Sequence, residues 1–112
     1  PVIAPLTHDG QGTMLNTNAD TIAGETAMAL VPFFDITLVY CFEKAGVLSD
    51  DDSVIPEINE ESFAQLVRDG VISGGMIPKI ENALKACRKG VAKVVITRAD
   101  AIGQDKGTVI KL

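Results

Sequence analysis

The chain has 112 residues, which is one domain's worth of sequence with room for a modest hydrophobic core. Apolar residues make up 46% of the chain and aromatic residues only 4%, so the core must consist of aliphatic side chains, as where helices pack closely on a β-sheet. The net charge of −5 argues against nucleic acid or an anionic membrane as a partner, because both require basic patches.

The N-terminal part predicts a hairpin followed by a helix. Residues 1–6 have the apolar character of a short strand, Asp9-Gly10 is a tight-turn signal, and residues 13–15 return as a second strand. A helical pattern then covers residues 18–31. Its many alanines predict an unusually close approach to a neighbouring sheet.

Strands and helices alternate over the rest of the chain. Strands are predicted at residues 35–42, 91–98 and 107–112, one helix at residues 59–70 with Asn59 as its cap, and another after Gly74-Gly75 that ends at Gly90. The first of these strands has the continuous apolar, β-branched character of a buried parallel strand. This order indicates an α/β fold in a single domain, residues 1–112, with a mainly parallel sheet flanked by helices as an αβα sandwich.

The two cysteines, Cys41 and Cys87, are not spaced as a metal-binding or redox pair. Both fall in apolar patterns, so we expect both to be small buried hydrophobic residues. No run approaches the ~20 apolar residues of a membrane span, and no basic-then-apolar leader precedes Pro1. Together these features are typical of a protein of the reducing cytoplasm.

Three polar residues crowd the start of the first predicted helix: Asn16, Asn18 and Asp20. One such residue is expected as a helix cap, because its side chain accepts a backbone N–H. Three are more than a cap needs, and a helix start also offers unbonded N–H groups and a favourable dipole. Asp20 there is stabilised as an anion, which suits a fixed charge that orients cations better than a proton shuttle.

The stretch SGGMIPK, residues 73–79, is the second candidate site. Its two glycines allow the backbone to approach a ligand closely, and the helix start that follows presents N–H donors. Lys79 lies one turn into this helix and can reach a phosphate held at its terminus. The Gly-x-x-x-x-Gly-Lys-Ser/Thr pattern of a P-loop is absent, so the motif by itself is weak. Loop glycines and a solvated lysine are the structural alternative.

Two other groups are weaker candidates. His8 beside Asp9 resembles a base with its orienting acid, but a hairpin tip is expected to expose both side chains. The acidic run of residues 50–52 lacks the glycine and glutamate spacing of a calcium loop, so we expect a solvated loop there. No metal ligand is expected in this chain.

The runs NTNAD and GGMIPK carry a specific resemblance to a known family. The chain, from VIAPL to GTVI, resembles the carboxy-terminal, nucleotide-binding half of acetylglutamate kinases in the amino acid kinase superfamily. The resemblance implies transfer of a phosphoryl group from ATP to the side-chain carboxylate of an N-acylated glutamate in arginine biosynthesis, with Mg²⁺ accompanying ATP. It also implies a homo-oligomer of the full-length enzyme.

Residue by residue, the resemblance implies the following roles. Asn16 and Asn18 match positions that bind the amino-acid substrate, and Asp20 matches the aspartate that holds catalytic lysines in place. Lys79 matches the lysine that neutralises charge on the transferring phosphoryl group and touches the nucleotide. Gly75 and Met76 match the turn beside the nucleotide phosphates.

The nucleotide-contacting run after the strand over residues 35–42 departs from the family pattern. Phe42 and Glu43 stand where the family has Leu-Thr/Ser-Asp-Val, with Gly46 in the turn that follows, and we expect these three residues to contact the nucleotide. Residues 97–108 are shorter than their counterpart in arginine-inhibited members and lack its histidine, so no inhibition by arginine is expected.

The family's amino-terminal half has no counterpart in this chain. That half carries a Gly-rich strand with another catalytic lysine and most of the acyl-glutamate pocket, so we expect the chain to hold about half an active site and to be inactive alone. Two other functions are left open: another kinase of the superfamily, such as a glutamate 5-kinase or a uridylate kinase, and a non-catalytic nucleotide-binding module. The choice between an acetyl and a succinyl substrate is also open.

Overall fold

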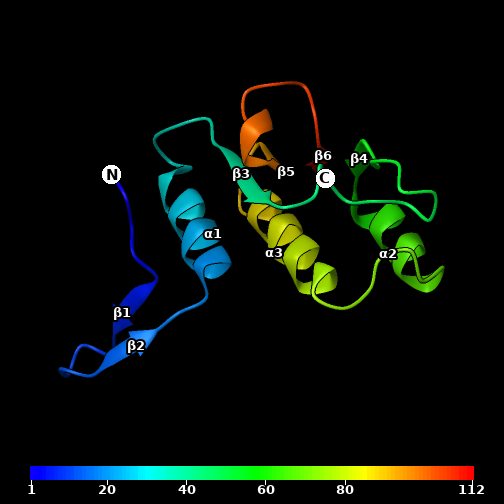
Figure 1. Ribbon diagram of the computed structural model, residues 1–112. Coiled ribbons are helices and arrows are strands. Elements are labelled where there is room, and N and C mark those ends of the chain that lie inside the picture. Colours follow the sequence, from blue (N-terminus) through cyan, green and yellow to red (C-terminus); the bar gives the residue numbers. More distant parts are fainter.

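The computed structural model describes residues 1–112 and contains three helices and two sheets (Figure 1). In chain order the elements are β1 (Leu6–His8), β2 (Met14–Asn16), α1 (Ala19–Leu30), β3 (Thr37–Phe42), β4 (Glu57–Ile58), α2 (Glu60–Arg68), α3 (Met76–Arg88), β5 (Lys93–Arg98), the short 3₁₀ helix η1 (Ala99–Ala101) and β6 (Thr108–Ile110). None of the helices is long and apolar enough to cross a membrane.

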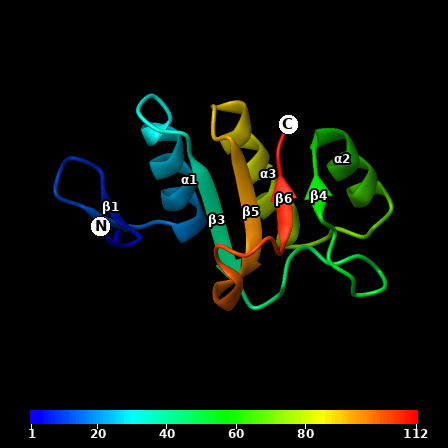
Figure 2. The ribbon, with the colours of Figure 1, turned by 90° about the horizontal axis from the view of Figure 1, so that it is seen from above.

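The main sheet has four strands in the order β3-β5-β6-β4. The β3–β5 and β4–β6 pairs are parallel, and the β5–β6 pair is antiparallel. Helices α1 and α3 lie side by side over one face of this sheet, and α2 lies beyond them next to β4 (Figure 2). The predicted α/β fold with a mostly parallel sheet is therefore confirmed.

The core lies between α3 and the two central strands. Its fully buried side chains are almost all aliphatic: Ile58, Ile80, Leu84, Val94, Ile96 and Ile110. On α3, Ile80, Ala83, Leu84 and Cys87 are buried, and Ile77 is half-buried. Aliphatic and small side chains thus form the inner face of this helix.

Local signals set the helix ends as predicted. The Asn59 side chain accepts a hydrogen bond from the backbone N–H of Ser62, and the Ser62 hydroxyl accepts one from the Asn59 N–H, which together form a capping box at the start of α2. Just past the ends of α2 and α3, Gly70 and Gly90 take the left-handed conformation, with φ of +74° and +102°.

The predictions for two strands need correction. The first strand begins at Leu6 instead of covering residues 1–6, because the backbone that can pair with it, β2, is only three residues long. β3 is parallel as expected but is not buried on both faces, because α1 and α3 cover only one face of the sheet. Tyr40 is its one buried residue.

The prediction that both cysteines are buried is wrong for Cys41. Successive strand residues point to opposite faces of a sheet. Tyr40 therefore faces the helices, and Cys41 points to the face that α1 and α3 leave uncovered, where it is exposed. Cys87 is buried on α3 as predicted.

The β1–β2 hairpin projects away from the main sheet in both views (Figures 1 and 2). Its turn contains Gly10 and Gly12, both with positive φ, and the Asp9 N–H donates to the Thr13 carbonyl. The hairpin leads directly into Asn18, the cap of α1. The start of α1 therefore lies where the hairpin meets the body of the molecule.

Two glycines of the predicted site differ in what surrounds them, which gives a test of the packing. A Cβ atom at Gly46 would lie 2.7 Å from Val54 Cγ1 and 2.8 Å from Thr108 Oγ1, whereas a Cβ at Gly75 would meet no atom within 4 Å. We expect Gly46→Ala to lower the free energy of unfolding by about 1–3 kcal/mol. Gly75→Ala should change it by less than about 1 kcal/mol, because Gly75 already has helical φ and ψ. Urea denaturation of both variants checks this, and equal losses would contradict the packing argument.

Candidate functional site

An ion pair joins the first turns of α1 and α3. Lys79 Nζ lies 2.5 Å from Asp20 Oδ2, although the two residues are 59 positions apart in the sequence. The side chains are 21% and 34% exposed respectively, so the pair is partly shielded from water and still reachable by a ligand. The structure thus brings together the two charged residues that the sequence analysis singled out from separate motifs.

The start of α1 holds Asp20 in place through its cap. Asn18 Oδ1 accepts a hydrogen bond of 2.8 Å from the Asp20 N–H, so Asn18 is the N-terminal cap of α1. Asp20 lies in the first turn, where the helix dipole stabilises a carboxylate. Asn16, on β2, is exposed, and its side chain makes no hydrogen bond within the chain.

Tyr40 is a residue of this site that the sequence analysis missed. Its hydroxyl donates a hydrogen bond of 3.1 Å to the backbone carbonyl of Asp20, and its ring centroid lies 5.2 Å from Lys79 Nζ. The Phe42 ring centroid lies 5.9 Å from the same nitrogen. Positions 40 and 42 share a face of β3, and this alternation was the available sequence signal.

The Asp20 carboxylate and the protein interior shift the titration of Tyr40. Burial is the larger cause and the negative charge of Asp20 the second; together they raise the pKa of the phenol from 10.0 to about 12. The hydroxyl therefore stays protonated and remains a donor well above neutral pH.

The start of α3 has the features of an anion-binding helix terminus. Gly75 is its cap residue and provides no side-chain hydrogen bond, and the first turn contains no acidic residue. The N–H groups of Gly74 and Gly75 donate to no other group of the chain. A Cβ atom added at Gly75 would meet no atom within 4 Å, so the backbone at this helix start is open to a ligand.

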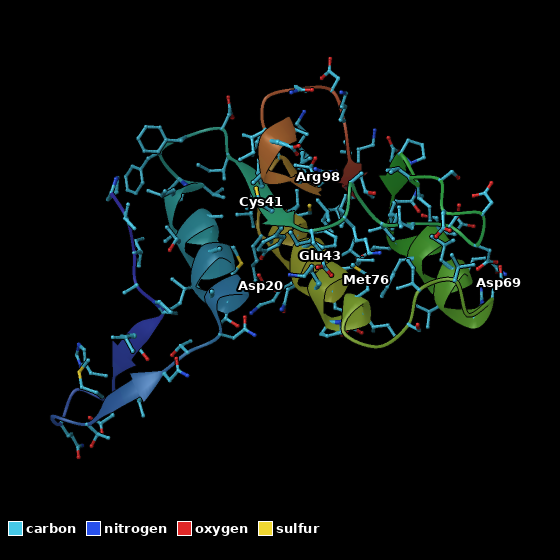
Figure 3. All side chains as sticks on the ribbon, in the orientation of Figure 1. Asp20, Cys41, Glu43, Asp69, Met76 and Arg98 are labelled. Carbon is cyan, nitrogen blue, oxygen red and sulfur yellow. The ribbon has the colours of Figure 1, made fainter.

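A cleft of about 200 Å³ opens beside this helix start. Its walls come from the loop after β3 and from the segment that leads into α3: Lys44, Gly46, Val47, Leu48, Val71, Ile72, Ser73 and Met76. Figure 3 shows Met76 at the start of α3 and Asp20 at the start of α1. Of the expected nucleotide-contacting residues, Gly46 and Met76 line this cleft directly.

The weaker candidates have local roles. His8 Nδ1 accepts the Gly10 N–H and Asp9 Oδ1 accepts the Gln11 N–H, so both residues stabilise the exposed hairpin turn, as expected. In the acidic loop, hydrogen bonds from Ser49 and Ser53 lower the pKa of Asp51 to about 2. Asp69 lies at the far end of α2, away from Asp20 and Met76 (Figure 3).

The chain is similar to known kinases over nearly all of its length. Residues 1–98 match the amino acid kinase family. The acetylglutamate kinase of Bacteroides thetaiotaomicron is 68% identical over 114 aligned residues, which cover 99% of this chain and 44% of that relative. The acetylglutamate kinase of Cytophaga hutchinsonii is 54% identical and aligns with 91% of this chain and 40% of its own length. The chain therefore spans less than half the length of these relatives.

A solved structure has the same fold. The protein smu.665 of Streptococcus mutans superposes with a TM-score of 0.82 and 36% identity, covering 99% of this chain and 42% of its own. The superposition includes nearly all of this chain and less than half of smu.665.

Titration of Tyr40 tests the geometry of the site. The chain has one tyrosine and no tryptophan, so phenolate absorbance reports on Tyr40 alone. We expect a midpoint of about 12 in the folded protein instead of 10.0, and a lower midpoint in Asp20→Asn, which removes the neighbouring charge. Because folding raises this pKa, the stability contributed by the neutral phenol is complete below pH 10.0 and is lost as the pH rises through about 12. A midpoint near 10.0 while circular dichroism still shows a folded chain would contradict the observed contacts.

Proposed function

The chain belongs to the amino acid kinase family, and from this premise we propose that it forms the nucleotide-binding part of a cytoplasmic acetylglutamate kinase of arginine biosynthesis. The observation that carries the proposal is the Asp20–Lys79 pair beside a helix start with unbonded N–H groups. The identity of 68% to the Bacteroides thetaiotaomicron enzyme supports this reaction over the others of the family.

The proposed reaction is a direct phosphoryl transfer. A side-chain carboxylate oxygen of N-acetyl-L-glutamate forms a bond to the γ-phosphorus of ATP, while the bond from that phosphorus to the β–γ bridging oxygen breaks. The bridging oxygen leaves with the electron pair as part of ADP, and the product is an acyl phosphate. Since no proton has to be removed from the carboxylate, the protein mainly has to position the reactants and neutralise charge.

Lys79 and the start of α3 are proposed to provide that neutralisation. Lys79 belongs to the first turn of α3, which begins directly after Gly74 and Gly75, so its ammonium is proposed to contact the same phosphate as their N–H groups. Asp20 keeps the ammonium in this region, and its hydrogen bond leaves the other ammonium protons for phosphate oxygens. We assign Asp20 and Lys79 as catalytic, and Asn16 and Asn18 as binding the amino-acid substrate.

The cleft beside α3 is proposed to hold the base and ribose of ATP. Its walls include the apolar side chains of Val47, Leu48 and Met76, which suit a flat aromatic base. Phe42 and Glu43 precede this loop at the end of β3 and are proposed to complete the nucleotide contacts with Gly46 and Gly75. This location follows the rule that ligands of α/β folds bind beyond the carboxyl ends of parallel strands.

Mg²⁺ enters this proposal as part of the substrate MgATP. The chain has no group of three or more His, Cys, Asp or Glu side chains that could hold a metal ion. Its residues therefore do not fit a resident metal centre, and no step is assigned to protein-bound metal.

The rest of the active site is proposed to come from the part of the enzyme that this chain does not include. The chain covers 44% of the Bacteroides thetaiotaomicron relative, and β3 leaves one edge of the sheet unpaired. Beside that edge, an apolar groove of about 340 Å³ is lined by residues that include Ile22, Leu30, Ile36 and Leu38. We propose that the substrate lobe packs against this edge and groove and carries the contacts of a homo-oligomer.

A chimeric enzyme tests the proposed function. In it, this chain replaces the corresponding part of the Bacteroides thetaiotaomicron acetylglutamate kinase, to which it is 68% identical. We expect ADP release that depends on N-acetylglutamate, with the acyl phosphate trapped by hydroxylamine, because the chimera contains both halves of the site. The 112-residue chain alone should show no turnover. A folded chimera that binds ATP without phosphorylating N-acetylglutamate would contradict the proposal, and a screen with other acceptors would then identify a different kinase.

Two lysines of α3 provide a matched test of the catalytic assignment in the chimera. We expect Lys79→Met to lower kcat by about 100-fold or more, because it removes a positive charge from the transferring phosphoryl group. Lys85→Met, on the same helix, removes an exposed lysine whose partner is Glu25 and should change kcat by less than about twofold. Steady-state kinetics with saturating ATP measures both, and an unchanged kcat in Lys79→Met would favour a non-catalytic nucleotide-binding role.

A further inference from the structure

We propose that Tyr40 is a positioning residue that holds the Asp20–Lys79 pair in its working arrangement from the sheet side. Its hydroxyl anchors the first turn of α1, and its ring supports the ammonium of Lys79. The inference rests on the proposed function for its effect on turnover, while its structural part stands on the contacts of this chain.

The hydroxyl of Tyr40 ties β3 to the turn that carries Asp20. It donates to the backbone carbonyl of Asp20, which as a helix residue also faces the N–H of Gly24 four positions on. A carbonyl oxygen has two lone pairs and can accept both bonds. A Cβ at Gly24 would lie 3.4 Å from the Tyr40 hydroxyl, which is ordinary van der Waals contact, so the phenol lies directly against α1 at this position.

The Tyr40 ring restricts the position of the Lys79 ammonium, in addition to the Asp20 carboxylate. Lys79 Nζ lies 5.2 Å from the Tyr40 centroid and 5.9 Å from the Phe42 centroid, both within the range of about 6 Å for cation–π contacts. With Asp20 Oδ2 at 2.5 Å, the charge is held between a carboxylate and two rings. A lysine side chain is otherwise flexible, so this arrangement places the charge in advance of nucleotide binding.

At position 40, a tyrosine provides both the hydrogen bond to α1 and the ring beside the Lys79 ammonium. A phenylalanine would keep the ring but lose the bond to α1, and an aliphatic residue would lose both. The raised pKa of Tyr40, about 12, means that the phenol keeps its proton, and with it the hydrogen bond, over the whole neutral range.

Tyr40 is also a core residue, only 4% exposed, so the test must separate positioning from packing. The measurement that does so is the NMR signal of the Lys79 side-chain CεH₂ group, in the 112-residue chain labelled with ¹³C-lysine and assigned through Lys79→Met. In the parent chain we expect ring currents to displace this signal from that of exposed Lys85. In Tyr40→Leu the displacement should fall by about half or more, because only the Phe42 ring is left.

Kinetics of the chimera supply the second readout. We expect Tyr40→Leu to lower kcat by about tenfold while KM for ATP changes much less, because a misplaced charge acts mainly on the transition state. Tyr40→Phe should keep the Lys79 signal, speed amide exchange at Gly24 and lower kcat by about threefold. Ile110→Val, in the core of β6 and away from the site, is the packing control and should alter neither the Lys79 signal nor kcat.

The results distinguish failure of the positioning role of Tyr40 from failure of the proposed kinase function. An unchanged Lys79 signal in Tyr40→Leu, or an unchanged kcat in an active chimera, would overturn the positioning role of Tyr40. If Tyr40→Leu does not fold, Tyr40→Phe decides: unchanged amide exchange at Gly24 together with unchanged kcat overturns the role. An inactive parent chimera would instead overturn the proposed function, and the spectra of the isolated chain would still decide whether Tyr40 holds Lys79.

Discussion

The contact between Asp20 and Lys79 determines how the two halves of the site meet. It joins the first turns of α1 and α3, which come from different parts of the chain. Because the side chains are 21% and 34% exposed, the attraction is only partly screened, and neither charge pays the full cost of desolvation. The pair therefore fixes a positive charge at a place where an anionic ligand can still reach it.

Small residues make this arrangement sterically feasible. Gly46 lets the loop after β3 lie directly against Thr108, since a Cβ atom there would come within 2.8 Å of Thr108 Oγ1, and Ala27 on α1 and Ala83 on α3 are buried. At the start of α3 the missing side chain of Gly75 has a different consequence, because no protein atom fills the space beside it. Some glycines of this chain thus bring elements of the protein together, while Gly75 leaves room for a ligand.

Apolar surface is exposed along the edge strand β3 and on the β1–β2 hairpin. β3 is an edge strand, the β1–β2 hairpin projects, and the large apolar side chains of Ile3, Leu6 and Met14 are more than half exposed. Relatives that are more than twice as long have further chain available to cover such surfaces. Around α3, β5 and β6, in contrast, the chain has a mainly aliphatic buried core of its own.

Features that depend on neighbouring residues could be predicted from the sequence. The three helices, the cap at Asn59 and the glycine stops at positions 70 and 90 follow from backbone rules acting over a few residues, whereas the short strand β4 lies in a stretch that was expected to be a loop. The two motifs that supply Asp20 and Lys79 were also visible in the sequence. The contact between the two side chains was expected from these two motifs taken together.

The surroundings of each strand depend on long-range packing. Alternation placed Tyr40 and Phe42 on one face of β3, but it could not show that Lys79, 39 positions later, would lie over both rings. It could not show either that β3 is an edge strand with Cys41 exposed, or that the first strand begins at Leu6. Burial and pairing depend on which distant segments fold alongside a strand, and no local pattern contains that information.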